Sequence, residues 1–142
     1  MSFALLLSSF AAVAAAAPSK TAHAHVVIAG HAFSVEIVDT EAARERGLMF
    51  RTHMASDHGM LFMYEDAQPL TFWMKNTLIP LDILFFDAHR QLINVAANTP
   101  PCKIADCPTY ASAAPAQYVL ELNAQTVTEL HIQQGEILEI DR

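Results

Sequence analysis

The chain has 142 residues, a size typical of a single domain, and 53% of them are hydrophobic. Its 15 acidic residues outnumber its 8 Lys and Arg residues, so the formal charge is -7. Nucleic-acid binding requires a basic face, which this acidic composition does not favour. A helix that spans a membrane needs ~20 apolar residues, and no apolar run beyond residue 25 approaches this length. We therefore expect no nucleic-acid partner and no membrane span in the main part of the chain.

The N-terminal segment has the features of a cleavable secretory signal. The run from Ala4 to Ala17 is apolar but too short to cross a bilayer as a stable helix, and small residues suited to cleavage follow. Cleavage is expected after Ala17 or after Ala24, and the second position is preferred because Pro18 follows the first. We therefore expect a signal peptide over residues 1–24 and a periplasmic or secreted protein.

The mature chain, residues 25–142, is expected to form one domain that begins with a β-hairpin. Apolar residues alternate with polar ones on either side of a glycine, over residues 25–28 and 33–37. A short helix capped by Asp39 or Thr40 is predicted to run through Arg46 and to stop at Gly47. Strands over 60–64 and 70–74 are then predicted to form a second hairpin.

The second half of the chain is also rich in short strands. A long apolar strand over 78–86 is predicted to pair with 91–97, and a proline-rich loop follows over 99–115. Strands are expected over 118–122 and 136–140, separated by a helical turn that a capping box opens at Thr126. Seven or eight short strands with two short helices predict a mainly β fold, an antiparallel β-sandwich or a partly closed barrel.

Several motifs resemble a known family in both order and spacing. They are Arg46-Gly-Leu-Met-Phe-Arg51, Gly59-Met-Leu-Phe62, Phe72-Trp-Met-Lys-Asn-Thr77, Ile79-Pro-Leu-Asp-Ile83, Pro101-Cys102 and Tyr118-Val-Leu-Glu-Leu-Asn-Ala124. The chain resembles the family called domain of unknown function 192 over roughly residues 33 to 140. The resemblance implies a compact β-sandwich, often exported, with no established activity. One departure is Asp87-Ala-His-Arg90, because a glycine is common in that turn of the family.

Two cysteines predict a structural disulfide. Cys102 and Cys107 lie in one proline-bounded loop, in a protein expected to reach an oxidising compartment where paired thiols are normally joined. A redox role would favour a Cys-x-x-Cys motif at the start of a helix, and neither the spacing nor the loop fits that pattern.

A polar cluster in an apolar strand pair is the main candidate for a ligand site. Its members are Trp73, Lys75, Asn76, Thr77 and Asp82. An ammonium and a carboxylate this close to a sheet core must be paired or solvated in a cleft. The alternation of a strand places Trp73, Lys75 and Thr77 on one face, which suggests a platform of ring, cation and hydroxyl. The alternative is an ion pair of Lys or Arg with Asp that fixes the strand register.

Two arginines extend this candidate site. Arg46 and Arg51 flank the Gly-Leu-Met turn, where they could clamp a carboxylate or phosphate, or could instead pair with acids of neighbouring elements. The leading hypothesis is therefore a binding module without catalytic activity or cofactor. Its partner would be a small anionic molecule, a glycan or a segment of an envelope protein.

Two other classes of function remain open at this stage. No common catalytic motif is present in the sequence. Asp82 and Glu121 could in principle form the carboxylate pair of a glycoside hydrolase. A cleft in which Lys, Arg and an acid of raised pKa converge would favour an enzyme. Copper binding would use methionine and histidine side chains, which suit copper(I). The candidates are Met49, Met54, Met60, Met63, Met74, His53 and His58, together with an N-terminal His25.

Overall fold

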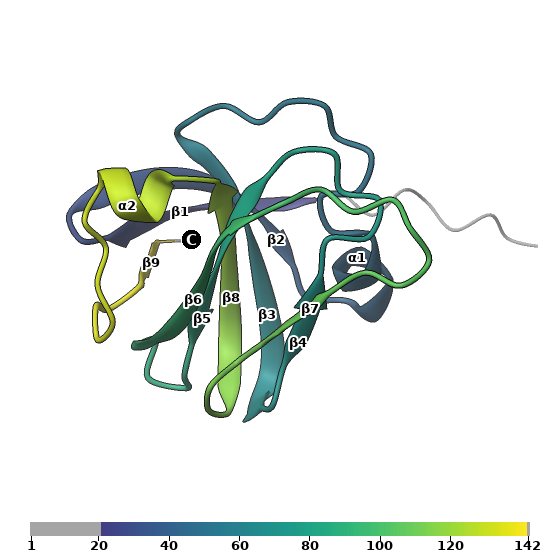
Figure 1. Cartoon of the computed structure of the whole chain (residues 1–142). Helices are drawn as coiled ribbons and strands as arrows, with labels where there is room; N and C mark the ends of the chain where they lie inside the picture. The colour runs from purple at the N-terminus through teal and green to yellow at the C-terminus, as the bar shows by residue number, and fades with distance from the viewer. Residues whose placement is uncertain (1–20, 142) are drawn as a thin grey trace, which may run out of the picture.

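The computed structural model describes residues 21–141, which fold into one mainly β domain. A sheet of seven strands has the order β6-β5-β8-β3-β2-β1-β9, and β4 and β7 form a separate two-stranded sheet (Figure 1). The strands are β1 Ala22–Ile28, β2 His31–Val38, β3 His58–Gln68, β4 Thr71–Trp73, β5 Leu81–Phe86, β6 Leu92–Thr99, β7 Thr109–Ala111, β8 Ala116–Asn123 and β9 Glu139–Asp141. The helices are α1 Glu41–Arg46 and α2 Thr126–Glu129.

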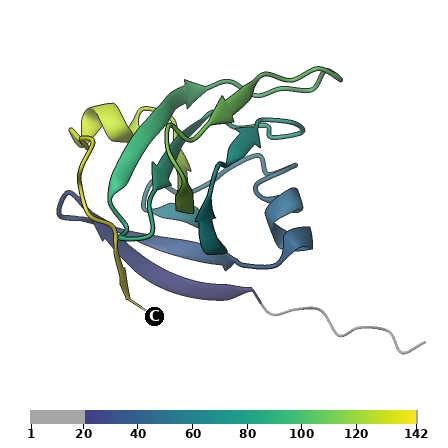
Figure 2. The ribbon, with the colours of Figure 1, turned by 90° about the horizontal axis from the view of Figure 1, so that it is seen from below.

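The predicted fold class is confirmed, with one pair of strands that departs from the antiparallel pattern. Strand β3 runs parallel to β2, with Val35 opposite Gly59, while the other pairs of the large sheet are antiparallel. The sheet curls strongly without becoming a closed barrel (Figure 2). An isolated bridge between Gln91 and Ile137 brings the segment before β9 close to the start of β6.

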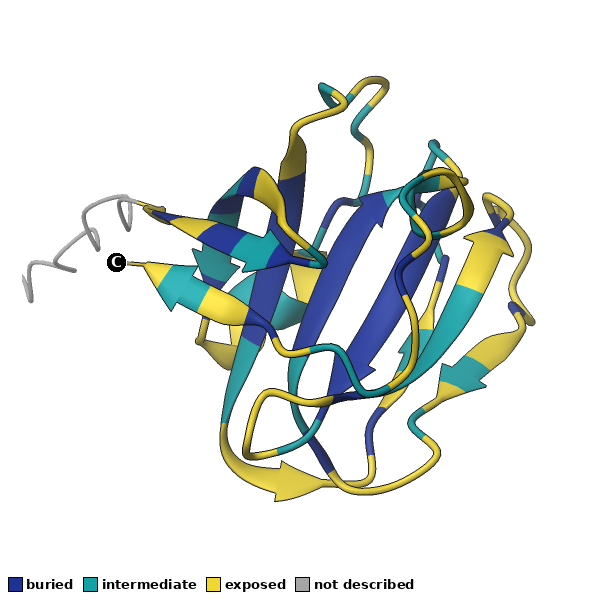
Figure 3. Cartoon of the chain, turned by 90° about the vertical axis from the view of Figure 1, so that its left-hand side faces the viewer, coloured by how far each residue is buried: buried dark blue, intermediate teal, exposed yellow. Residues whose placement is uncertain are grey.

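The large sheet is covered on both faces. Along β5, Leu84 and Phe86 belong to one apolar cluster, whereas Ile83 and Phe85 belong to the cluster on the other face. All six residues of β5 are buried, as Figure 3 shows for the central strands. Apart from Asp82, this strand is a continuous apolar run, since alternate side chains enter two different cores.

The predicted hairpin of 60–64 with 70–74 is wrong. Strand β3 pairs with β2 and β8, and β4 pairs with β7, which forms within the expected loop over 99–115. The first and third predicted pairings are confirmed, as β1 with β2 and β5 with β6. Strand β5 starts after Pro80 rather than at residue 78.

Motif residues of the sequence have identifiable structural roles. A Cβ atom added at Gly59 would lie 2.7 Å from the carbonyl oxygen of Glu121, so only glycine lets β3 approach β8 this closely. In the turn where glycine is common in the family, Arg90 adopts the left-handed conformation with φ of 64°. The Asp87 side chain supports this turn because it accepts hydrogen bonds from the backbone amides of His89 and Gln91.

The predicted disulfide is present, and it anchors a loop beside β4. Cys102 and Cys107 are joined, and the Cys102 carbonyl accepts a hydrogen bond from the Asn76 amide at 2.9 Å. The Cys102 amide donates in turn to the carbonyl of Met74. The disulfide loop is thereby held against residues 74–76.

The predicted signal peptide falls mostly outside the described residues. A cut after Ala17 would lie outside them, while a cut after Ala24 would divide β1, in which Ala24 is buried and lies opposite Val35. Within residues 21–141 no helix combines the length and the apolar character needed to cross a membrane.

Candidate functional site

A cleft of about 410 Å³ lies between α1 and β4, above the face of the large sheet formed by β3 and β8. Its volume is within the ~300–1,000 Å³ typical of small-molecule sites. The lining comes from α1 and the turn after it, from β3, from β4 and the residues after it, and from β8. The residues are Glu41, Arg44, Glu45, Arg46, Gly47, Leu48, Met49, Phe62, Tyr64, Gln68, Thr71, Phe72, Trp73, Lys75, Thr77 and Glu121.

Aromatic rings form one wall of the cleft. Trp73 is 50% exposed, and the partly buried Phe72 packs edge-to-face on Phe62, with ring centroids 4.9 Å apart. Side chains alternate along β4, so Phe72 is partly buried while Thr71 and Trp73 on the other side of the strand are exposed. A second hollow shares Trp73, Glu45, Arg46 and Met49 with the cleft, so the indole ring borders both spaces.

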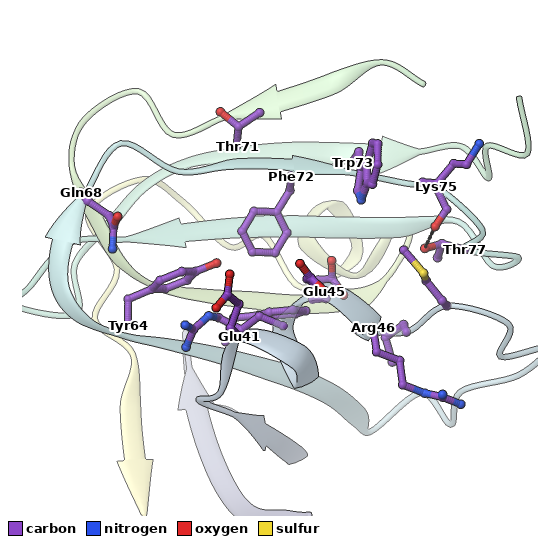
Figure 4. Close-up of a pocket in the computed structure, with 16 residues that line it drawn as sticks. Glu41, Glu45, Arg46, Tyr64, Gln68, Thr71, Phe72, Trp73, Lys75 and Thr77 are labelled. Carbon is purple, nitrogen blue, oxygen red and sulfur yellow. Dashed lines mark hydrogen bonds between the residues drawn. The ribbon is translucent and has the colours of Figure 1, made fainter. Parts of the chain in front are cut away.

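Helix α1 forms the opposite wall. Thr40 caps this helix as predicted, because its side-chain oxygen accepts a hydrogen bond from the Ala43 amide. The carboxyl groups of Glu41 and Glu45 turn toward the rings of the other wall (Figure 4). The charged ends of Arg46 and Lys75 point away from the centre of the cleft in the same view. Two carboxyl groups therefore face the interior, while two of the three cationic side chains that line the cleft direct their charges elsewhere.

Arg44 is held in place by the structure around it. Its guanidinium donates to the carbonyl oxygens of Asp39 at 2.6 Å and Met63 at 3.0 Å, and it lies 4.6 Å from the centre of the Tyr64 ring. Burial raises the pKa of Tyr64, the Arg44 charge opposes this rise, and the Glu121 carboxyl adds to it. Arg44 and Tyr64 thus form a fixed polar side of the cleft.

Glu121 lies at the base of the cleft. Glu121 is 5% exposed, and the residues opposite it on the neighbouring strands, Met60 and Ile83, are apolar. Among residues 21–141 its carboxyl group has neither a hydrogen-bond partner nor an ion-pair partner. Burial raises the pKa of Glu121 to about 8, so the group is mostly protonated at neutral pH.

Four of the seven residues predicted for the ligand site line the cleft. They are Arg46, Trp73, Lys75 and Thr77. Within the described part of the chain, Lys75 has no acidic partner, and its ammonium donates to the carbonyl of Ile104 at 2.5 Å. Thr77 is buried, and its hydroxyl donates to the Lys75 carbonyl at 3.4 Å. The ion pair of Lys75 with Asp82, which was the alternative to a ligand role, does not form.

The other three predicted residues have structural roles away from the cleft. Arg51 forms a two-pronged ion pair with Glu36, and this contact holds the pKa of Glu36 below its usual value. Asn76 occupies a left-handed turn with φ of 54°, where its backbone binds Phe50 and Cys102. The predicted clamp of two arginines is therefore not assembled.

The Asp82 side chain binds backbone amides that lie far from it in the sequence. Its carboxylate is fully buried and accepts hydrogen bonds from the amides of Asn98 at 2.8 Å and Val127 at 2.9 Å. The predicted capping box at Thr126 does not form, because the residue that precedes α2 is Gln125 and the cap comes from Asp82 instead. Asp82 lies opposite Leu122, whereas Glu121 lies opposite Ile83, so the two acids face opposite sides of the sheet. They do not form a glycosidase pair.

The methionine and histidine side chains of the copper hypothesis are divided between two cores and the surface. Met60 and Met74 are buried in the core on the cleft side of the sheet, while Met63 packs against the core on the other side. His58 pairs with Asp57 at 2.7 Å on the surface. Among residues 21–141, no three His, Cys, Asp or Glu side chains are grouped as a metal site would require.

Several residues of the site were not predicted from the sequence. They are Tyr64, Phe72, Glu41, Glu45 and Arg44, while Glu121 was considered only as the partner of Asp82. A signal for Glu121 was present, since it is a lone acid among the apolar residues of β8.

Two solved structures are close to this chain. A protein from Sinorhizobium meliloti 1021, provisionally described as a transcription regulator, is 38% identical with a TM-score of 0.80, over 87% of this chain and 98% of its own. A protein of unknown function from Novosphingobium aromaticivorans DSM 12444 is 37% identical with a TM-score of 0.79, over 91% of this chain and 94% of its own. No curated protein matches the chain.

The family model for domain of unknown function 192, described as an uncharacterized ACR, matches residues 24–140. This match spans nearly all of the described residues and agrees with the motifs that led to the resemblance. The chain belongs to the domain of unknown function 192 family.

Proposed function

We propose that the cleft binds a neutral, hydroxyl-rich ligand, a segment of a glycan, and that Trp73 is its main contact. The half-exposed indole at the mouth of a polar cleft is the observation that carries this proposal. Aromatic rings offer an apolar face to the C–H groups of a sugar, and the surrounding polar groups bind its hydroxyls. The two hollows that border Trp73 would accommodate more than one sugar unit.

The charges of the cleft favour a glycan over the small anionic ligand that was also predicted. Arg51 is committed to Glu36, and the charged ends of Arg46 and Lys75 point away from the cleft centre (Figure 4). Glu41 and Glu45 turn inward and would repel an anion. The same carboxylates can accept hydrogen bonds from sugar hydroxyls, and Arg44 and Gln68 can donate.

We also propose that the protein acts outside the cytoplasm. The Cys102–Cys107 disulfide supports this, because such bonds persist in oxidising compartments. Signal cleavage after Ala17 is favoured over cleavage after Ala24, since the later cut would remove paired residues from β1. Given the charge of -7, we propose no nucleic-acid partner.

Replacement of Trp73 with alanine is expected to weaken glycan binding by roughly tenfold to a hundredfold, since stacking of a ring contributes ~1–3 kcal/mol. The measurement is isothermal titration calorimetry with neutral tetrasaccharides of glucose and of N-acetylglucosamine. Because Trp73 is exposed, the variant should fold normally.

The matched control is Phe50→Ala, which removes another exposed ring that does not line the cleft. Its affinity should equal that of the unmodified protein. Equal losses in both variants, or none in Trp73→Ala, would count against the proposed role of Trp73.

A further inference from the structure

Glu121 is a buried acid whose side chain no other part of the fold uses. Each of the other buried polar side chains has a partner: Asp82 accepts from two amides, Thr99 donates to the Leu81 carbonyl and Thr77 to the Lys75 carbonyl. Glu121 alone among the buried polar side chains of residues 21–141 has none. Among residues 21–141, no side-chain nitrogen or oxygen that is sealed from solvent lacks a partner, so the unpaired carboxyl oxygens of Glu121 are reached from the cleft. A polar group that opens onto a cleft and has no partner in the fold is available to a ligand.

The position of Glu121 connects it to the cleft. The side chain comes from β8 in the middle of the sheet, on the face that carries Met60 and Phe62, and it lines the cleft. A ligand that fills the cleft would reach this group after passing Trp73 at the mouth. Water or ligand in the cleft is then the remaining source of a hydrogen-bond partner.

We propose that the Glu121 carboxyl group is the innermost recognition group of the site and donates a hydrogen bond to an oxygen atom of the bound glycan. This inference rests on the proposed function and adds the chemistry of the deepest contact. The apolar neighbours of Glu121 disfavour its charged form, so the acid keeps its proton at neutral pH. A protonated carboxyl can donate, whereas a carboxylate can only accept.

The proposal implies that binding depends on pH with a definite sign. Below pH 8 the acid is protonated and the contact forms, and above pH 8 it ionises and the donor is lost. The other charged or titratable groups around the cleft are Glu41, Arg44, Glu45 and Arg46 on α1, Tyr64 on β3 and Lys75 after β4. Substitution of Glu121 alone separates its contribution from theirs.

The test is calorimetric titration of the same neutral tetrasaccharides at pH 6 and pH 9. For the unmodified protein, the affinity should be roughly tenfold lower at pH 9. Glu121→Gln keeps a donor that does not titrate, so it should bind with similar affinity at both pH values. Glu121→Leu has no polar group and should bind roughly tenfold or more weakly at pH 6. Glu65→Gln, the same change at an exposed position outside the cleft, should behave as the unmodified protein.

The outcomes separate the two proposals. Full affinity in Glu121→Leu together with a loss in Trp73→Ala would overturn the role of Glu121 and leave glycan binding in place. An affinity that rises with pH would also overturn it, because an ionised Glu121 would then be accepting hydrogen bonds from the sugar hydroxyls instead of donating one. If none of the tetrasaccharides binds, both proposals are overturned.

Discussion

Between pH 5 and pH 9, the unmodified protein is expected to lose roughly 4 kcal/mol of unfolding free energy that Glu121→Gln retains. The pKa of Glu121 is about 8 in the folded protein, against an ordinary value of 4.5. Between these two pKa values the folded state holds a proton that the unfolded state has released. A rise in pH therefore favours unfolding, and the penalty reaches its full size above pH 8.

The measurement is urea denaturation of both proteins at several pH values. The two proteins differ only at residue 121, so the difference between their curves reports the ionisation of Glu121 together with its effect on Tyr64. Glu65→Gln provides the matched control, because this exposed glutamate lies on the same strand as Tyr64 but outside the cleft. If the curves of the unmodified protein and Glu121→Gln run parallel from pH 5 to pH 9, Glu121 ionises normally and its proposed role as a donor is wrong.

Replacement of Asp82 with asparagine is expected to lower the unfolding free energy by about 3 kcal/mol. The Asp82 carboxylate is fully buried and accepts from two backbone amides, one of which begins α2. An asparagine side chain has one acceptor oxygen, so its NH₂ group would face the second amide and leave both donors unpaired. Hydrogen bonds to a charged group contribute ~1.5–3 kcal/mol each, so the loss of one of them together with an unpaired amide accounts for the expected effect.

Chemical denaturation at neutral pH measures this effect, and Asp66→Asn is the matched control because Asp66 is exposed on β3. Hydrogen exchange at the Val127 amide adds a local reading, since that amide should lose protection when its acceptor is removed. A stability loss below 1 kcal/mol with unchanged exchange at Val127 would show that Asp82 does not hold α2 in this way.

Local sequence patterns predicted local structure well. The β1–β2 and β5–β6 hairpins, the Thr40 cap of α1 and the disulfide all depend on residues close together in the chain. Turn residues and alternation carry that information directly. The wrong hairpin shows the limit, because β3 and β4 are adjacent in sequence but find their partners in β8 and β7.

The candidate site was predicted in part for the same reason. Trp73 and Lys75 were identified from one short segment of the sequence, and both line the cleft. The opposite wall comes from α1 and the base from β8, segments whose proximity depends on the parallel pairing of β2 with β3. No short-range pattern specifies that pairing, which is why Glu121 and Glu45 were not connected with Trp73.

Asp82 illustrates a further limit of sequence interpretation. Its closeness to Lys75 in the chain suggested an ion pair, but a turn and Pro80 intervene before β5 begins. The carboxylate instead satisfies two amides from segments 16 and 45 residues away. A buried acid in a strand thus predicts a partner without specifying whether that partner is a cation, backbone or a ligand.

Trp73 offers the most direct test of the central claim, because it is the only tryptophan in the chain and lies at the mouth of the cleft. Its fluorescence can be followed in the unmodified protein during titration with neutral tetrasaccharides of glucose and of N-acetylglucosamine. Glycan binding predicts a saturable change in intensity with a shift to shorter wavelength, as a half-exposed indole becomes covered. Unchanged emission with every tetrasaccharide, in protein shown to be folded, would contradict the claim that this cleft binds glycans.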